Sequence, residues 1–457
     1  MSIAASKLAL LQHIVQHLRL EPWKQGPFTQ SDLEALQMFT GQIGPKGFVG
    51  IRAEAAEAVN LLADGIFSNS PFQRGTTFQA VQKQLTDIII GNYVERASAP
   101  VVTKDVAFVQ QKIADWFNEQ IAMHEFYIPC FITPWRGAAF SMGPIRFTHV
   151  QDFAPVAQSE TGPLYEATFG PVFDLMGRTA ANWIATVQID GCTKERAEEI
   201  ANLAVDVALA GLQICIPEDS ARHMARMTGR TMPVFSQTVS RSTGHLSSAT
   251  LNTEPGRAFG PGFLEKCISE AKPVLDSIAK RLERYVLGVG GLTKLEQAWP
   301  DAAYWFHEGL AEPLDTIAVP KLETALEVLL RSESRKGSKK RVLKAIEACY
   351  GKKATEFINP QSQTTVEQFA EGFVRDRSRI LHGTWSTLTH SLRASRPNLT
   401  TLTRDLLIVY TVVLDQYAAS PSPTDAVDDF LKFVDTQRQL AAAQAASAAK
   451  SPPASRA

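Results

Sequence analysis

The strongest constraint on the fold of this chain is the series of segments after Phe263 whose apolar residues recur with the spacing of an amphipathic helix. A helix of this kind is stable only when its apolar face packs against other elements, so several in succession predict a helical bundle. The segments cover residues 264–287, 302–314, 319–331, 339–350, 365–381, 399–417 and 426–446. We therefore expect a helical domain over residues 263–438 and a disordered tail, rich in Ala, Gln and Ser, over residues 439–457.

The part of the chain that precedes this domain has a mixed texture. Residues 1–160 alternate short helical segments with stretches rich in Gly and Pro, which leaves their fold open. Residues 126–153 are aromatic and favour β-structure, but prolines interrupt them, so they fit either a small sheet or an irregular loop. Residues 161–258 are expected to form an α+β unit, either separate or joined with residues 1–160 in one sensor or regulatory domain.

We expect an α+β unit over residues 161–258 because segments typical of strands and of a helix follow one another there. Residues 183–189 form a mostly apolar run typical of a buried strand, and Thr193 can cap the N-terminus of a helix through residues 197–212. Two further β-favouring runs follow, at residues 233–240 and 246–252. The chain is therefore predicted to be mainly α, with a mixed α+β N-terminal part and a C-terminal helical bundle.

Composition excludes several classes of protein. With 45% hydrophobic and 20% charged residues, the chain has the make-up of a soluble globular protein. Its net charge of −1 argues against a protein that coats nucleic acid by bulk charge, so a nucleic-acid site must be a local basic patch. The 5 cysteines have no paired or metal-type spacing, which fits a reducing compartment, and no apolar run is long enough to cross a membrane. We expect a cytoplasmic protein without a membrane partner.

Residues 375–383 are the most unusual segment of the expected bundle, because alternate positions hold three arginines and a histidine follows. A helical projection places Arg377 near the centre of the apolar stripe, whereas Arg375, Arg379 and His382 fall on the opposite side. A buried cation is costly unless it has a partner. Arg377 and His382 would lie about 140° apart on an unbroken helix. Either the helix breaks near the motif, or a second copy of the chain completes the site at a two-fold axis.

The segment Arg377-Ser378-Arg379-Ile380-Leu381-His382-Gly383 resembles the Arg-Ser-Lys-Ile-Val-His-Gly motif of the ApeA-like branch of the HEPN superfamily. The helix expected over residues 319–330 is similar to an earlier helix of that branch, in which a small residue precedes a Leu-Glu-x-Leu-Leu run. The resemblance covers residues 265–420.

The resemblance implies an HEPN-type helical bundle that dimerises so that two RxxxxH motifs face each other. It also implies a metal-independent ribonuclease without a cofactor. Arg377 and His382 would be the catalytic pair, and Ser378 would lie against the RNA or tRNA substrate. Arg375 and Arg379 could hold flanking phosphates of that substrate, or could be solvated charges. Ser378 departs from the Asn, Asp or His that often follows the arginine in the superfamily. The implied setting is abortive-infection defence, with a phage-derived trigger acting through the N-terminal region.

The chemistry of these two residue types fits RNA cleavage. RNA carries its own nucleophile, the 2′-hydroxyl, so the protein has to supply proton transfer and charge stabilisation but no metal. His382 would act as general base or acid, and Arg377, from the same or a partner chain, would stabilise the charge that develops on the phosphoryl oxygens. The products would be a cyclic phosphate and a free 5′-hydroxyl.

Two features flank the motif in the sequence. The motif helix is expected to begin at a capping box, with Thr364 as N-cap and Glu367 three residues on. A second basic segment, residues 335–341, is expected to be a flexible loop between two helices. Its Lys339, Lys340 and Arg341 would contact RNA phosphates, or would be the solvated charges of a connector.

Two other functions stay open from the sequence. One is a catalytically inactive HEPN module whose arginines bind RNA or a partner protein, and the other is a purely structural dimerisation protein. The motifs of P-loop nucleotidases, GxSxG hydrolases, HExxH metalloproteases and dinucleotide-binding enzymes are absent.

Overall fold

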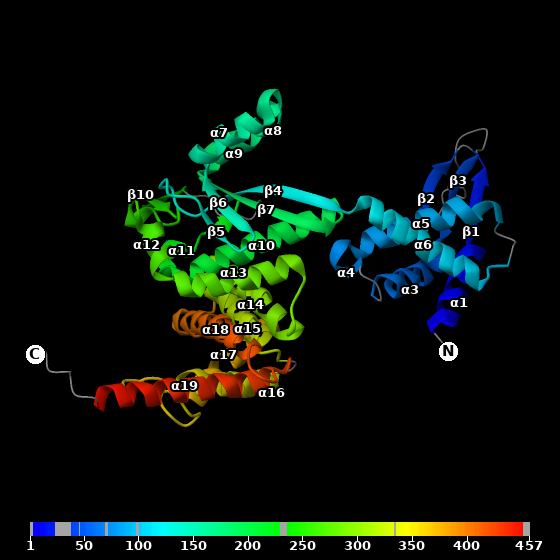
Figure 1. Cartoon of the computed structure of the whole chain (residues 1–457). Coiled ribbons are helices and arrows are strands. Elements are labelled where there is room, and N and C mark those ends of the chain that lie inside the picture. The colour runs from blue at the N-terminus through cyan, green and yellow to red at the C-terminus, as the bar shows by residue number, and fades with distance from the viewer. Residues whose placement is uncertain are drawn as a thin grey trace, which may run out of the picture. The chain divides into compact units, whose positions relative to one another are not determined.

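A computed structural model of the chain describes residues 3–22, 38–44, 46–68, 72–96, 100–228, 235–332 and 335–450. The contacts divide the chain into two compact units. Unit 1 comprises Met1–His124 and Ile189–Ile200, and unit 2 comprises Glu125–Gln188 and Ala201–Ala457. Helices predominate in Figure 1, and the mainly α fold with a smaller sheet-containing part is thereby confirmed.

Unit 1 consists of helices and a small antiparallel sheet that share one core. Its helices are α1 (Ile3–Gln16), α3 (Ala56–Phe67), α4 (Phe72–Gly75), α5 (Phe78–Tyr93) and α6 (Thr103–Gln120), and its strands are β1 (Leu18–Pro22), β2 (Met38–Gly44) and β3 (Gly47–Arg52), in the order β1-β3-β2. Leu11, Val59, Leu85 and Ile113, one from each long helix, are fully buried. The N-terminal region therefore has a hydrophobic core of its own.

A five-stranded sheet in the order β5-β6-β7-β4-β8 accounts for residues 126–153, which settles their fold in favour of a sheet. Its strands are β4 (Ala122–Phe131), β5 (Phe140–Met142), β6 (Ile145–His149), β7 (Trp183–Cys192) and β8 (Ala225–Arg226). Strands β6 and β7 pair with Ile145 opposite Val187, and both side chains are buried. This pairing joins strands from the two regions expected at residues 1–160 and 161–258. The two compact units of the structure therefore divide after His124 and not at residue 160.

The helices that follow these strands complete the part of unit 2 before the bundle. They are α7 (Val150–Thr161), α8 (Tyr165–Thr168), α9 (Gly170–Thr179), α10 (Lys194–Cys215), whose first residues belong to unit 1, and α11 (Glu218–Ala221). Phe153, Phe169 and Met176 bury the inner faces of α7 and α9 in a small aromatic cluster. The helix expected after Thr193 is confirmed as α10.

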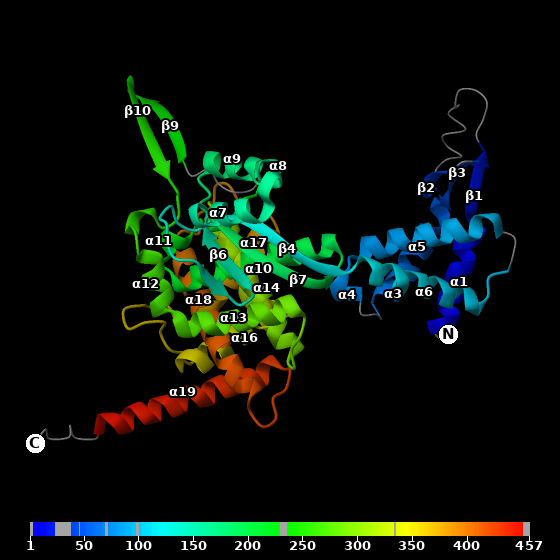
Figure 2. The same ribbon diagram turned by 45° about the horizontal axis from the view of Figure 1, so that its top comes forward.

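The two β-favouring runs expected near residues 233–252 form one antiparallel hairpin, β9 (Phe235–Ser242) with β10 (His245–Asn252). The hairpin projects from unit 2 in Figure 2, and every residue of β10 is exposed. Gly244, with φ +85°, allows the tight reversal between the strands.

The helical domain expected after Phe263 is confirmed as a bundle. Its helices are α12 (Phe263–Glu270), α13 (Lys272–Leu287), α14 (Thr293–Ala311), α15 (Asp315–Leu329), α16 (Arg335–Tyr350), α17 (Val366–Leu381), α18 (Ser395–Ala418) and α19 (Val427–Lys450). In Figure 1, α19 lies alongside α16, and the two helices pack against each other.

Two expectations about this region are wrong. The basic segment at residues 335–341 is the first part of helix α16 and not a loop. The tail expected to be disordered from residue 439 continues helix α19 as far as Lys450, because Ala and Gln favour the helical conformation even without an apolar stripe. Residues 451–457 lie outside the described residues.

The bundle core contains an ion-pair network as well as apolar side chains. Arg281 of α13 is buried between Glu296 of α14, 2.7 Å away, and Asp415 of α18. Burial lowers the pKa of Arg281 to about 10, because the charged form loses its hydration. Trp299 Nε1 donates to the carbonyl of Leu407, at 3.0 Å, and ties α14 to α18.

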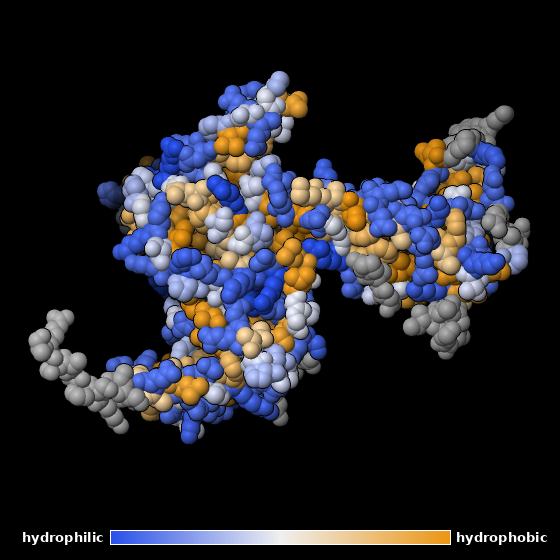
Figure 3. All heavy atoms as spheres, in the orientation of Figure 1, coloured by the Kyte–Doolittle hydropathy of each residue, from blue (hydrophilic) through white to orange (hydrophobic). Residues whose placement is uncertain are grey.

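The face drawn in Figure 3 is largely hydrophilic, with apolar residues in scattered patches. Within the described ranges, no helix has both the length and the apolar character needed to cross a membrane.

Candidate functional site

Helix α17 carries the motif and is unbroken. It begins one residue later than expected: the Thr365 side chain accepts from the Gln368 backbone N–H at 3.2 Å, and Gln368 Oε1 accepts from the Thr365 N–H at 3.0 Å. The helix then runs to Leu381, with His382 as its C-cap. A break within the motif is thereby excluded as the way to bring Arg377 and His382 together.

Arg377 points into the bundle and pairs with two carboxylates of its own chain. Its Nε lies 2.8 Å from Glu323 Oε2, and one Nη lies 2.9 Å from Glu327 Oε2. The two glutamates are one turn apart on α15. Glu323 is fully buried, whereas the Arg377 side chain is 27% exposed. The cation on the apolar stripe thus has its partners within the chain, which sequence periodicity alone does not reveal.

The Nε–Oε2 contact is an ion pair and not an aligned hydrogen bond, since neither atom has a hydrogen-bond partner. Ser338 of α16 donates to Glu323 Oε1 at 3.1 Å. Burial, followed by the neighbouring Glu327, raises the pKa of Glu323 to about 7, against the opposing effect of Arg377 and Ser338. This carboxyl group therefore takes up a proton close to neutral pH.

His382 lies on the outside of the bundle. His382 is exposed, and its imidazole has no hydrogen-bond, ion-pair or ring partner among the residues that the structure describes. Arg377 faces α15 and His382 faces solvent, so one copy of the chain does not bring the two expected catalytic side chains together.

The other arginines of the motif lie on the outer face, as the helical projection predicts. Arg375 is exposed and has Asp376 as an ion-pair neighbour at 3.5 Å. Arg379 is exposed, and its guanidinium carbon lies 4.7 Å from the ring centroid of Trp385. Ser378 is half-buried between these two faces.

A stack of side chains follows the motif and was missed by sequence analysis. The ring of His390 lies 3.9 Å from that of Trp385, with 27° between the ring planes. Together with Arg379, these residues form a cationic and aromatic strip beside His382, which we call the Arg379–Trp385–His390 strip. Trp385, an aromatic residue two positions after the motif glycine Gly383, was the sequence signal for it.

The basic segment of α16 is largely paired. Lys339 Nζ lies 3.1 Å from Glu367 and 2.9 Å from Glu371, both on α17. Arg341 donates to the carbonyl of Leu330 at 2.7 Å. Lys340 is exposed, which leaves it as the best phosphate contact of the three expected residues.

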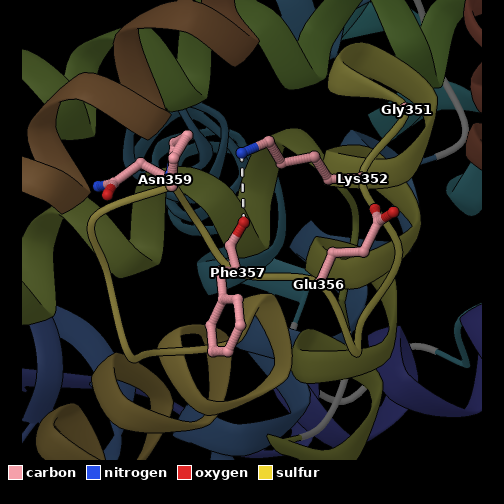
Figure 4. Close-up of a pocket in the computed structure, with 6 residues that line it drawn as sticks. Gly351, Lys352, Glu356, Phe357 and Asn359 are labelled. Atoms are coloured by element: carbon pink, nitrogen blue, oxygen red, sulfur yellow. Dashed lines mark hydrogen bonds between the residues drawn. The ribbon is translucent and has the colours of Figure 1, made fainter.

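A surface pocket lies in the turn between α16 and α17, lined by Gly351, Lys352, Glu356, Phe357, Asn359 and Pro360. Figure 4 shows the Lys352 amino group directed at the Phe357 carbonyl, to which it donates at 3.3 Å. The Lys353 N–H donates to Glu356 at 2.6 Å. Because its lysine amine and glutamate carboxylate are bonded within the turn, we assign this pocket a structural role.

Across the described ranges, no group of three or more His, Cys, Asp or Glu side chains is placed to hold a metal ion. Comparison of the chain with protein-family models, curated proteins and solved structures finds no match.

Proposed function

We propose that this protein is a metal-independent endoribonuclease of HEPN type, whose site is completed by a second copy of the chain. The observation that carries the proposal is the position of His382: an imidazole free for proton transfer, at the exposed end of α17 and beside the Arg379–Trp385–His390 strip. Histidine is the side chain best suited to proton transfer near neutral pH.

Arg377 keeps the means to stabilise a phosphate. Its pairs with Glu323 and Glu327 use Nε and one terminal nitrogen, and the side chain is partly exposed. Because burial raises the pKa of Glu323 to about 7, part of the molecules at neutral pH carry one carboxylate charge against one guanidinium charge at this site. A guanidinium can then still donate from its free edge to the phosphoryl oxygens of an RNA held at the partner's His382.

The chemical step needs only residues of the chain and the RNA itself. His382 takes the proton of the 2′-hydroxyl, whose oxygen forms a bond to phosphorus as the bond to the 5′-oxygen breaks. The leaving 5′-oxygen takes a proton from the imidazolium of a histidine or from water. The products are a 2′,3′-cyclic phosphate and a 5′-hydroxyl.

Cleavage of total RNA and of tRNA by the purified protein in EDTA tests the proposal. His382→Ala is expected to abolish cleavage while it preserves the fold, and His245→Ala, at an exposed histidine of the hairpin, is the matched control. Cleavage by His382→Ala at the rate of the parent would show that this site assignment is wrong. Light scattering of parent and variants tests the dimer.

The ion pairs of Arg377 with Glu323 and Glu327 favour a second function, binding without catalysis. If the arginine serves only to balance these carboxylates, the helical domain is an RNA- or protein-binding module without catalysis. A parent protein that binds RNA but leaves it intact under every condition, including during phage infection, would establish this alternative.

The biological setting belongs to the same proposal. We propose a cytoplasmic protein of abortive-infection defence in which the N-terminal region, residues 1–258, senses a phage-derived trigger and holds the ribonuclease inactive until then. Growth of a bacterial host that expresses the parent or His382→Ala, with and without phage, tests this setting.

A further inference from the structure

We propose that the Arg379–Trp385–His390 strip is a stacking platform for one unpaired nucleobase of the RNA, so that the substrate class is single-stranded RNA. This inference rests on the proposed function for its ligand, but it is carried by a separate set of residues. None of the three is part of the Arg377 ion-pair site.

The chain holds Trp385 firmly in place next to the motif. Gly383 adopts φ +68°, which reverses the chain directly after α17. The backbone N–H groups of Thr384 and Trp385 then both donate to the carbonyl of Arg379, at 2.9 and 3.2 Å. These bonds fix the tryptophan against the last turn of the helix.

A further bond anchors the middle of the same loop. The Thr316 hydroxyl, at the start of α15, donates to the carbonyl of Thr387 at 2.6 Å. Thr316 itself is buried. The platform is therefore tied to two helices of the bundle, and a base that binds there meets a pre-organised surface.

The His390 ring occupies the place of a base in the free protein. It is a planar heteroaromatic ring, nearly parallel to the indole, with its centroid 3.9 Å from that of Trp385. This is the geometry in which nucleobases stack on aromatic side chains. His390 is exposed, and the stack with Trp385 is the one side-chain contact that the described residues give its ring. Rotation of this side chain would open the indole face to a base.

The charge around the platform suits a polyanion. The loop between α17 and α18, residues 382–394, contains Arg393 and no Asp or Glu, and Arg379 lies at the end of α17 before it. Arg396 is buried and caps the carbonyls at the end of α14, but Arg379 and Arg393 are exposed. Arg379 lies over the indole and can contact the phosphate that follows a stacked base.

Stacking on a platform of this kind selects for unpaired RNA. In a duplex both faces of every base are covered by neighbouring bases, whereas in a single strand or a loop a base can turn out onto an aromatic side chain. Trp385 is three residues from His382, so a stacked base would belong to a nucleotide close to the cleaved bond.

The test measures binding of a fluorescein-labelled single-stranded RNA and of a blunt duplex of equal length. Every protein carries His382→Ala, so that no cleavage occurs. Trp385→Ala is expected to weaken binding of the single strand about tenfold or more. Trp385→Phe should retain most of the affinity, because a phenyl ring still stacks. Binding of the duplex should change little in both variants.

His390→Ala provides a second, independent measurement on an exposed residue. Removal of the competing imidazole should strengthen binding of the single strand, with no change for the duplex. Thermal melting of each variant confirms that the fold is intact. Single-stranded affinity that is unchanged in Trp385→Ala, equal losses for the two RNAs, or no single-stranded binding by the parent would each overturn the stacking inference.

The outcomes separate this inference from the proposed function. Suppose that the chain with His382 intact cleaves RNA but that Trp385→Ala does not change the affinity for single-stranded RNA. The proposed ribonuclease function would then be retained, and the stacking platform would be rejected. If the chain never cleaves RNA but its binding of single-stranded RNA depends on Trp385, the platform would be retained and the ribonuclease function would be rejected.

Discussion

The two sides of helix α17 treat their charged residues in opposite ways. On the inner side, Arg377 is paired with Glu323 and Glu327, and Ser338 supports the buried carboxylate. On the outer side, the His382 imidazole has no partner among the described side chains, and Arg379 rests on an aromatic ring. The comparison teaches that the two ends of one sequence motif can lie in different environments: the arginine is held in ion pairs between two helices, whereas the histidine is exposed to solvent.

The largest expected effect is on the outer side. His382→Ala should lower RNA cleavage by about 10²–10⁴-fold, the usual contribution of a general acid or base. Because the imidazole makes no contact with the described part of the bundle, the melting temperature should not change. Cleavage is measured by the release of cyclic-phosphate ends, with His245→Ala as control. A large loss of stability in His382→Ala would break the comparison.

The next effect belongs to the inner side. Arg377→Ala leaves Glu323 and Glu327 without their cation, and it should lower the free energy of unfolding at pH 8 by about 3 kcal/mol, the lower end of the range for a broken buried pair. Denaturant unfolding measures the change. Arg375→Ala, two residues away on the exposed side, should leave the midpoint where it is.

The double variant Arg377→Ala with Glu323→Gln sharpens this result. A neutral amide no longer needs the cation, so part of the lost stability should return. If Arg377→Ala is as stable as Arg375→Ala, the inner side is not a structural ion pair and the contrast between the two faces fails.

A smaller effect should appear in the pH dependence of stability. The pKa of Glu323 is about 7 in the folded protein and ordinary in the unfolded chain, so between about pH 5 and 7 the folded state binds more protons than the unfolded state. The contribution of Glu323 to stability is therefore full at acidic pH and is lost as the pH rises through 7.

The variant Glu323→Gln isolates this effect, because it stays neutral at every pH. From pH 5 to pH 8 the parent should lose roughly 1–3 kcal/mol of unfolding free energy relative to the variant. Denaturant unfolding at several pH values gives the comparison, with Glu367→Gln, on the exposed side of α17, as control. If the unfolding free energies of the parent and of Glu323→Gln change equally between pH 5 and pH 8, the raised pKa of Glu323 is contradicted.

The smallest effect is expected for the basic segment of α16. Lys339 pairs with Glu367 and Glu371 at the surface, and such pairs contribute little because water screens them. Lys339→Ala should leave the denaturation midpoint unchanged. Lys340→Ala should weaken RNA binding slightly for every sequence and reduce its salt dependence, as loss of one phosphate contact does. A strong effect of Lys339→Ala on RNA affinity would mean that its ion pairs open on binding.

The helices of the bundle could be predicted from the sequence because apolar periodicity reports directly on which face is buried. The same reasoning placed Arg377 on the inner stripe and Arg375 and Arg379 outside. It could not name Glu323 as the partner, since the docking of α15 on α17 depends on side-chain packing between segments far apart in the chain. The capping box was misplaced by one residue because Thr364 and Thr365 are both able to cap.

Three other features could not be predicted from the sequence, each for a different physical reason. The basic segment contains Gly337 and Ser338, which suggested a loop, yet Ser338 is buried and bonds Glu323 within a helix. Trp385 and His390 of the Arg379–Trp385–His390 strip lie in the loop after α17, where apolar periodicity predicts nothing. The boundary between the two units depends on strand pairing across residue 160, which is a long-range property of the sheet.

The two carboxylates of α15 that contact Arg377, one of them fully buried, have a consequence for the evolution of this motif. A chain that keeps Glu323 and Glu327 is more stable with a cation at position 377, whether or not it cuts RNA. Loss of catalysis would release His382 from selection but would leave Arg377 under it. Among descendants of this protein, an arginine retained without its histidine would mark the lineages that have given up cleavage.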